Sequence, residues 1–399
     1  MIEKLLKFLF LALFIFNYNF LSGEDINLSW KGKSEFQNGI IIKTNTGEPI
    51  FGEINFDLEE NLSIHFGKDE NDLFEWISKI ELDCENNIYL LDSKKCTIFK
   101  YDNQGKYLYR IGRKGAGPAE FRRPRDFFID KKGKIYVLDN RIIHILTNSG
   151  NYKKQIKLNK YATNFFVNSK GEIIISFRSY SGKKKEIIVA LFSSDLKTEK
   201  KIAAFSEGEI IRRKIGDKKV TFYVEHIYTP GLYFARMYDD KCVFSNSSNY
   251  VLIVIDKRGN TLLKIKKEEK GYPILKTEKK IIYGKFAPYY EKKWGKKVLQ
   301  EALQFPKYRP FFNRMIVDEK GRIYVARLKS VIKKKKKDTH ITFDVFNKDG
   351  YYIYQIRVPF IPNLIRNGYL YYIDENNESE DIKVKRFKIK NWLSIKNKI

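Results

Sequence analysis

The chain is poor in cysteine. Its 399 residues include three cysteines, Cys84, Cys96 and Cys242. On the strand pattern described below, Cys84 lies in a turn and Cys96 lies beyond the far end of the next strand, about five to eight residues away at ~3.3 Å each. A disulfide needs Cα atoms within about 7 Å of each other. We therefore expect packed or free thiols, unless Cys242 meets one of the others through an unusual contact between repeats.

Histidine is also scarce. The four histidines are His65, His144, His226 and His340, and no two of them have the spacing of metal ligands. His144 and His340 fall in outer strands of the pattern, so they would not share a site. No nucleophile elbow is present either. The sequence therefore predicts no metal site, no cofactor and no catalytic residues.

Acidic residues are outnumbered by basic ones. Lysine and arginine total 76 against 48 aspartates and glutamates, which gives a net charge of +28. This charge is mostly lysine and is spread over all the turns, as on a solvated surface, so we do not expect nucleic-acid binding. The densest run, residues 333–337, would protrude from a hairpin. It is either a solvated loop tip or a weak contact to an anionic surface such as membrane lipid or acidic polysaccharide.

The one long apolar run lies at the N-terminus. Residues 5–16 are apolar except for Lys7, which together with Lys4 gives the run a basic start, and the small residues Ser22 and Gly23 follow it. This pattern predicts a signal peptide over residues 1–23 and an exported protein, periplasmic or extracellular. The alternative is an uncleaved membrane anchor, although Asn17 interrupts the run before it reaches about 20 residues. No cysteine follows the run, which excludes a lipoprotein anchor there.

A two-part unit recurs six times along the rest of the chain. Its first part is a strand, a polar turn and a second strand, at residues 80–92, 128–140, 166–177, 238–246, 316–328 and 365–376. A second hairpin follows each copy and is clearest at residues 98–112, 251–267 and 341–358. Asp83 and Asp130 stand 47 positions apart, and a four-stranded propeller blade needs roughly 40 to 50 residues. Two hairpins therefore make one blade.

These repeats predict an all-β fold, a six-bladed β-propeller with four-stranded blades. Turn pairs such as Lys132-Gly133 and Lys320-Gly321 supply the positive φ angles that tight hairpins require. A single blade cannot bury both of its faces, so the blades must stack and the ring must close. We expect an N-terminal lead over residues 24–73, the propeller over residues 74–392 and a tail over residues 393–399.

A glycine-rich loop, GRKGAGPAEF at residues 112–121, could be mistaken for a phosphate cradle. A phosphate loop opens a helix, whereas this loop ends one blade and leads into the innermost strand of the next. We expect its glycines to let the chain turn sharply from the rim to the axis.

Several linked motifs carry a family resemblance. They are the loop at residues 112–121, the D-x-x-G-x-I-Y-V-x-D strand at residues 130–139 and the segment FGEINFDLEENLSIHFG at residues 51–67. Together they resemble the uncharacterised exported six-bladed β-propellers of bacteria, which are similar to NHL-repeat propellers. Ala119 stands where that family often has glycine. The resemblance implies that part of residues 39–66 adds a strand to the last blade and closes the ring.

One stretch breaks the β pattern, at residues 276–306 between the fourth and fifth blades. From residue 289 to 303 the apolar residues recur near helical spacing. Pro288 and Pro306 would bound this helix. The inserted segment would either pack on the blades or form a lid over the central channel.

The channel mouth is the default binding site of such a fold. The chain enters three inner strands through residues 121–126, 228–236 and 308–314. The candidate ligand-binding residues in these segments are Arg123, Arg125, Arg236, Arg309, Arg314, Tyr233 and Tyr308. Arginines among aromatic rings suit an anionic or sugar-like ligand.

Two classes of function follow. The favoured one is an exported, non-catalytic binding or scaffold protein, monomeric, whose channel mouth engages a protein, a peptide or an anionic glycan. The alternative is a hydrolase or lyase acting on a carbohydrate or peptide in the channel. Two carboxylates within ~5 to 9 Å of each other at the axis would favour the enzyme, and an arginine and aromatic lining without them would favour binding.

Overall fold

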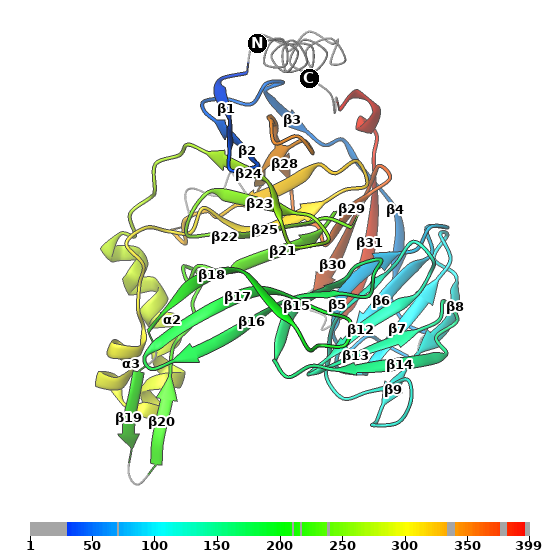
Figure 1. Ribbon diagram of the computed structural model, residues 1–399, viewed down its shortest axis with the longest axis horizontal. Helices are drawn as coiled ribbons and strands as arrows, with labels where there is room; N and C mark the ends of the chain where they lie inside the picture. Colours follow the sequence, from blue (N-terminus) through cyan, green and yellow to red (C-terminus); the bar gives the residue numbers. More distant parts are fainter. Residues whose placement is uncertain are drawn as a thin grey trace, which may run out of the picture.

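The computed structural model describes residues 30–69, 72–209, 211–215, 218–237, 240–332, 340–375 and 381–395. The expected signal peptide, the lysine run at residues 333–337 and the end of the tail from residue 396 lie outside the described residues. Within them the chain forms a six-bladed β-propeller, which confirms the fold expected from the repeats (Figure 1).

Each blade is an antiparallel sheet whose strands run in chain order from the axis outward. Blade 1 holds β5 (Ile77–Leu82), β6 (Ile88–Asp92), β7 (Thr97–Tyr101) and β8 (Tyr107–Ile111). Blade 2 holds β11 (Pro124–Ile129), β12 (Ile135–Asp139), β13 (Ile142–Leu146) and β14 (Tyr152–Lys157). Blade 3 holds β15 (Ala162–Val167), β16 (Ile173–Ser181), β17 (Lys184–Phe192) and β18 (Glu199–Glu209). Blade 4 holds β21 (Leu232–Arg236), β22 (Cys242–Asn246), β23 (Val251–Ile255) and β24 (Thr261–Lys267). Blade 5 holds β25 (Phe312–Val317), β26 (Ile323–Arg327), β27 (Ile341–Phe346) and β28 (Tyr352–Val358). Blade 6 holds β29 (Leu364–Arg366), β30 (Tyr369–Glu375) and β31 (Ile382–Ile389).

The N-terminal segment attaches to three blades in succession. The hairpin of β1 (Gly32–Gln37) and β2 (Ile40–Asn45) extends blade 4, where β2 runs parallel to β24. The short β3 (Glu53–Asn55) runs parallel to β28 of blade 5. Finally, β4 (Leu58–Ile64) pairs antiparallel with β31 and supplies the fourth strand of blade 6. The segment expected to provide one ring-closing strand therefore provides it and also straps the two preceding blades.

The turns of the inner hairpins share one side-chain arrangement. In blade 2 the carboxylate of Asp130 accepts the backbone N–H groups of Lys132 and Lys134, at 2.8 and 2.9 Å. Gly133 takes the required positive φ of 78°, and the hydroxyl of Tyr136 donates to the same carboxylate at 3.3 Å. Asp83 and Asp318 hold the corresponding turns of blades 1 and 5 in the same way. This is why the D-x-x-G-x-I-Y pattern recurs at the inner hairpins of blades 2 and 5, and in blade 1 with Asn86, whose φ is 64°, in place of the glycine.

The hydrogen-bond donors of the glycine-rich loop are occupied by a carboxylate of the loop itself. The carboxylate of Glu120 accepts the backbone N–H groups of Ala116 and Gly117, at 2.9 and 2.8 Å, and the side chain of Arg113 at 2.8 Å. These donors would otherwise suit a phosphate, so the loop is structural, as its position between blades indicates. Ala119 takes a φ of 58°, the left-handed conformation for which glycine is better suited.

The helical insertion is longer than expected. It forms α2 (Lys276–Trp294) and α3 (Lys296–Ala302), which meet at Gly295 with a φ of 82°. The expectation that the helix begins at Pro288 is wrong, because Pro288 lies inside α2. Both Pro288 and Gly284 face solvent, so the Gly284 carbonyl that loses its partner N–H is open to water and the helix continues.

The two helices lie beside the hairpin of β19 (Ile211–Ile215) and β20 (Lys218–Phe222), at the left of Figure 1 and away from β8 and β14. They pack on Phe222, Val224, Tyr228 and Leu328. Neither helix contributes a residue to the lining of the central cavity described next. The insertion therefore packs against the side of the propeller and is not a lid on this cavity.

Candidate functional site

A cavity of about 1390 Å³ lies on the propeller axis. It is lined by the first strand of every blade, namely β5, β11, β15, β21, β25 and β29, and by the turns that follow them. Inner strands converge on the axis of a propeller and leave space that packing does not fill. The cavity is therefore the natural place to look for a ligand site.

Five inner strands place a polar residue at the same register position. These residues are Lys79, Asp126, Asn164, Tyr233 and Arg314, which pair with Leu91, Leu138, Ser176, Ser245 and Ala326 of the neighbouring strands. We call them the polar ring. In four of the five strands a β-bulge immediately precedes this position. A bulge re-aims the side chains that follow it, so the ring depends on bulges at every position except that of Tyr233.

One side of the polar ring is an ion-pair network. The Lys79 ammonium contacts the carboxylate of Asp126 and lies 3.3 Å from that of Glu81. Burial alone would lower the pKa of Lys79, but the two carboxylates outweigh it and the pKa is raised. Burial also raises the pKa of Asp126, and Lys79 offsets this only in part.

Arg236 crosses the cavity from blade 4 toward this network. Its guanidinium lies 3.7 Å from Glu81 of blade 1 and 4.6 Å from the centre of the Phe128 ring of blade 2. Charge pairing and ring stacking both hold an arginine in place. Lys79 and Arg236 are thus neutralised by carboxylates of the protein itself.

The other side of the polar ring holds an unneutralised arginine. Arg314 is partly buried, and no carboxylate among the described residues pairs with it. Burial lowers the pKa of Arg314, and the nearby phenol of Tyr233 offsets this only in part. A cation held away from water without a counter-ion is costly. An added anion in the cavity would therefore stabilise Arg314.

The seven candidate residues separate into two groups. Arg125, Arg236, Arg314 and Tyr233 line the cavity, and Arg123, Arg309 and Tyr308 do not.

The expectation that all seven approach the axis is wrong for the last three, for two reasons. Arg123 precedes β11, where its backbone N–H donates to Asp139 and its side chain is exposed. Tyr308 and Arg309 pair with the chain that leads into α2, as the contacts of Tyr308 with Pro273 and of the Arg309 guanidinium with the Tyr272 ring demonstrate. Whether the other four bind a ligand stays a prediction.

Sequence reasoning missed Lys79, Glu81, Asp126 and Asn164. A signal for the ring members existed: Lys79, Asp126, Asn164 and Arg314 each stand four residues before a turn residue, respectively Asp83, Asp130, Asn168 and Asp318. Counting back from the turn in each repeat would have found the ring. Glu81 could have been found two residues later on the same strand.

Two carboxylates close together at the axis would favour an enzyme, and an arginine and aromatic lining would favour binding; the cavity has features of both. Glu81 and Asp126 both contact the ammonium of Lys79, so two carboxylates do converge at the axis. The same cavity also holds the arginine and aromatic lining that favours binding. Among the residues that the structure describes, no cluster of three histidine, cysteine or acidic side chains could hold a metal ion. The three cysteines are free.

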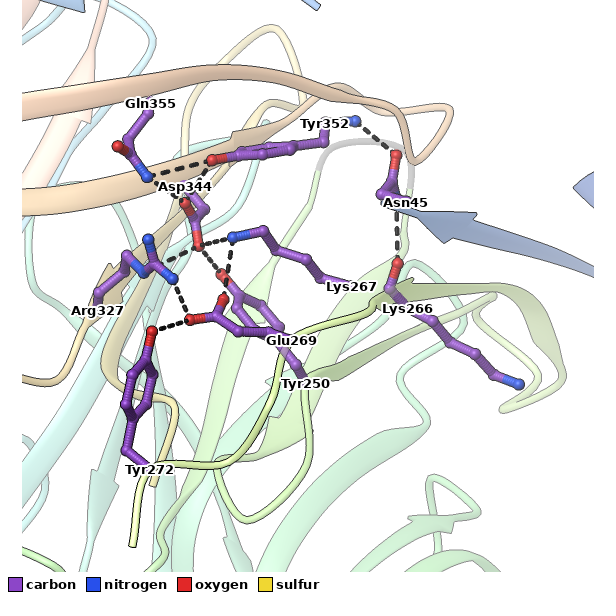
Figure 2. Close-up of polar contacts among 10 residues, drawn as sticks. All are labelled: Asn45, Tyr250, Lys266, Lys267, Glu269, Tyr272, Arg327, Asp344, Tyr352 and Gln355. Atoms are coloured by element: carbon purple, nitrogen blue, oxygen red, sulfur yellow. Dashed lines mark hydrogen bonds and ion pairs between the residues drawn. The ribbon is translucent and has the colours of Figure 1, made fainter. Parts of the chain in front are cut away.

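A second polar centre lies between blades 4 and 5, away from the axis. Figure 2 shows Asp344, fully buried, accepting hydrogen bonds from the phenols of Tyr250 and Tyr352 at 2.6 and 2.7 Å and from the ammonium of Lys267 at 3.0 Å. Arg327 bridges Asp344 and Glu269. All of these charges are paired within the protein, which indicates that this centre holds blades together.

Comparison with known proteins agrees with this architecture. Residues 55–245 match the family DUF5128, described as a 6-bladed beta-propeller. The chain has the fold of this family. The resemblance to exported bacterial propellers of this kind is confirmed.

Two solved structures from Bacteroides are similar in fold. A candidate exported protein from Bacteroides fragilis has a TM-score of 0.50 at 12% identity, over 88% of this chain and 99% of its own. A member of the DUF4221 family from Bacteroides vulgatus has a TM-score of 0.50 at 12% identity, over 84% of this chain and 98% of its own. No curated protein matches the chain. In the described part of the chain, none of the helices has the length and apolar character needed to cross a membrane.

Proposed function

We propose that this protein is an exported binding protein, without catalytic activity, whose channel mouth engages an anionic group of a protein, peptide or glycan. Export rests on the N-terminal sequence pattern of residues 1–23. The observation that carries the proposal is Arg314, a partly buried guanidinium in the central cavity with no carboxylate partner among the described residues. Arginine presents a planar fork of donors that matches a carboxylate or phosphate.

The surroundings of Arg314 support this function. Tyr233 lies beside it and is partly exposed to the cavity. Arg125 lines the same space from blade 2 and has no ion-pair partner in the described part of the chain. An anionic ligand in this cavity would meet two unneutralised guanidinium groups and an aromatic ring.

The replacement Arg314→Gln should weaken ligand binding about tenfold or more, because a charge-assisted hydrogen bond contributes roughly 1.5–3 kcal/mol. The mature chain from Glu24 would be screened against arrays of acidic glycans, neutral glycans and peptides, and affinities of the hits measured by calorimetry. Arg123→Gln is the matched control, since it removes the same charge outside the cavity. Equal affinity of the Arg314→Gln variant and the unmodified protein for every acidic hit would contradict the proposal.

A second candidate is a hydrolase or lyase acting on a carbohydrate or peptide in the same cavity. It is favoured by the convergence of Glu81 and Asp126 and by the raised pKa of Asp126, which suits a general acid. Against it, both carboxylates are engaged by Lys79.

Incubation of the unmodified protein with the same ligand panel should yield no product detectable by mass spectrometry. Turnover that disappears in the Asp126→Asn variant but persists in Arg123→Gln would replace the binding proposal by the enzymatic one.

A further inference from the structure

The central cavity continues outward over one sector of the propeller. There, besides Lys131, it is lined by five lysines from blades 2 and 3: Lys132 and Lys134 in the turn between β11 and β12, Lys153 and Lys154 in β14, and Lys170 in the turn between β15 and β16. We call these five residues the lysine rim. All except the partly buried Lys134 are exposed. Positive charge therefore gathers on one side of the cavity mouth.

The carboxylates in the cavity lining do not neutralise this rim. They are Glu81, Asp83, Asp126, Asp130 and Asp240. None of them forms an ion pair with a lysine of the rim: Glu81 and Asp126 pair with Lys79, Asp83 and Asp130 accept backbone N–H groups of their own turns, and Asp240 accepts the backbone N–H of Ser169. The cavity lining also carries eleven basic side chains against these five carboxylates. No ammonium group of the lysine rim has a hydrogen-bond or ion-pair partner in the part of the chain that the structure describes. The mouth is left with a one-sided positive field, which attracts and orients an anionic partner.

The shape of the site limits which kinds of anionic partner could bind. The lysines line a concavity that is continuous with the cavity of Arg314, so a flat anionic membrane could not reach the inner arginine together with the rim. A linear chain with regularly spaced negative groups could contact both. The partly exposed Tyr233 and Phe234 of β21 line the same cavity, and aromatic rings of this kind stack against the apolar faces of sugar rings.

We infer that the cavity binds a linear acidic polysaccharide, with one sugar carboxylate at Arg314 and the following sugar acids running outward along the lysine rim. This inference rests on the proposed binding function and specifies its ligand. Lysine acts along the rim as a set of point charges, whereas the guanidinium of Arg314 holds one carboxylate in a defined orientation. The affinity for the polysaccharide should therefore fall with added salt because of the lysine rim. It should depend on the orientation of one sugar carboxylate because of Arg314.

The test uses the mature chain from Glu24 with galacturonic acid, a decamer of galacturonic acid, a neutral galactose decamer, inorganic polyphosphate and single-stranded DNA. We expect the acidic decamer to bind more tightly than the monomer and the neutral decamer not to bind. The triple variant Lys153→Gln, Lys154→Gln and Lys170→Gln should lose about tenfold or more in affinity for the acidic decamer and should flatten its salt dependence. It should leave affinity for the monomer unchanged, whereas Arg314→Gln should weaken both.

The control triple variant carries Lys276→Gln, Lys280→Gln and Lys292→Gln on the exposed face of α2 and removes the same charge. An equal loss in this control would overturn the inference, since only net charge would then matter. Polyphosphate or DNA binding as tightly as the acidic decamer would overturn it too. Failure of all these probes, while Arg314→Gln still abolishes binding of an acidic peptide, would refute the polysaccharide and leave the proposed binding function standing.

Discussion

The replacement Asp344→Asn should lower the free energy of unfolding by about 3 to 5 kcal/mol, the usual cost of removing one partner from a buried ion pair. Asp344 is fully buried between blades 4 and 5 and accepts hydrogen bonds from two tyrosines, Gln355 and Lys267. Without its charge, Lys267 and Arg327 would share a single carboxylate, that of Glu269. Urea denaturation followed by tryptophan fluorescence measures the change.

A matched control for Asp344 is Glu53→Gln. Glu53 pairs with Arg357 at 3.0 Å on the same blade, but both side chains are about half exposed, at 50% and 46%. Surface ion pairs contribute about 1 kcal/mol or less. A loss at Asp344 no larger than that at Glu53 would contradict the assignment of this network as the joint between the two blades.

The same carboxylate should make stability depend on pH. Burial alone would raise the pKa of Asp344, but Lys267, Arg327 and the two phenols outweigh it and the pKa is lowered. A carboxyl group whose pKa is lower in the folded state contributes stability above its unfolded pKa of about 4, and this contribution is lost as pH falls through the folded value. The unmodified protein should therefore lose stability steeply below about pH 4. The Asp344→Asn variant should show a shallower loss over the same range, and parallel curves would contradict this account.

The blades could be predicted because each repeat contains the residues that define its own turn. Asp130, Gly133 and Tyr136 define one turn through hydrogen bonds within seven residues of each other, and the same spacing recurs at Asp83 and Asp318. Such signals are local, so a single sequence contains them. The blade count and the position of the inner strands followed from that repetition.

The contents of the channel were harder to predict because a bulge shifts the alternation of side chains. Arg125 occupies the bulge of β11, so Asp126 takes the ring position. The preceding Arg123 lies outside the strand and points to solvent. A difference of one or two residues thus decides which side chain takes the ring position and which one points to solvent. The ion pairs of Lys79 and Arg236 join three blades and are visible only after the ring has closed.

The start of α2 and its continuation through Pro288 could not be predicted from the sequence pattern either. Pro288 ordinarily ends a helix, and the apolar spacing before it is weak. The turns before Pro288 are held by Glu278, a buried carboxylate that accepts the backbone N–H of Leu275 and the hydroxyl of Tyr228. Tyr228 belongs to the loop that enters blade 4, so a distant tertiary contact decided where the helix begins.

Removal of the strand β4 should be the most damaging change to the fold. Blade 6 has three strands of its own, and β4 completes it by pairing with β31. Phe56 and Ile64 are buried by this arrangement, and Leu58 and Leu62 pack beside them. Burial of such side chains contributes about 1.5–3 kcal/mol each, so their loss should exceed about 5 kcal/mol, which approaches the whole stability of many domains.

Two truncated chains separate ring closure from the other contacts of the N-terminal segment. A chain that begins at Glu48 loses β1 and β2, which extend a blade that already has four strands, and keeps β3 and β4. A chain that begins at Gly67 loses all four. We expect the first to unfold cooperatively at a moderately lower temperature and the second to lack a cooperative transition by calorimetry. A synthetic peptide of residues 48–66 should restore the transition to the second chain, since the missing strand needs only to occupy the open edge of β31. If the chain from Gly67 unfolds cooperatively without the peptide, at the temperature of the chain from Glu48, then β4 does not hold the ring together.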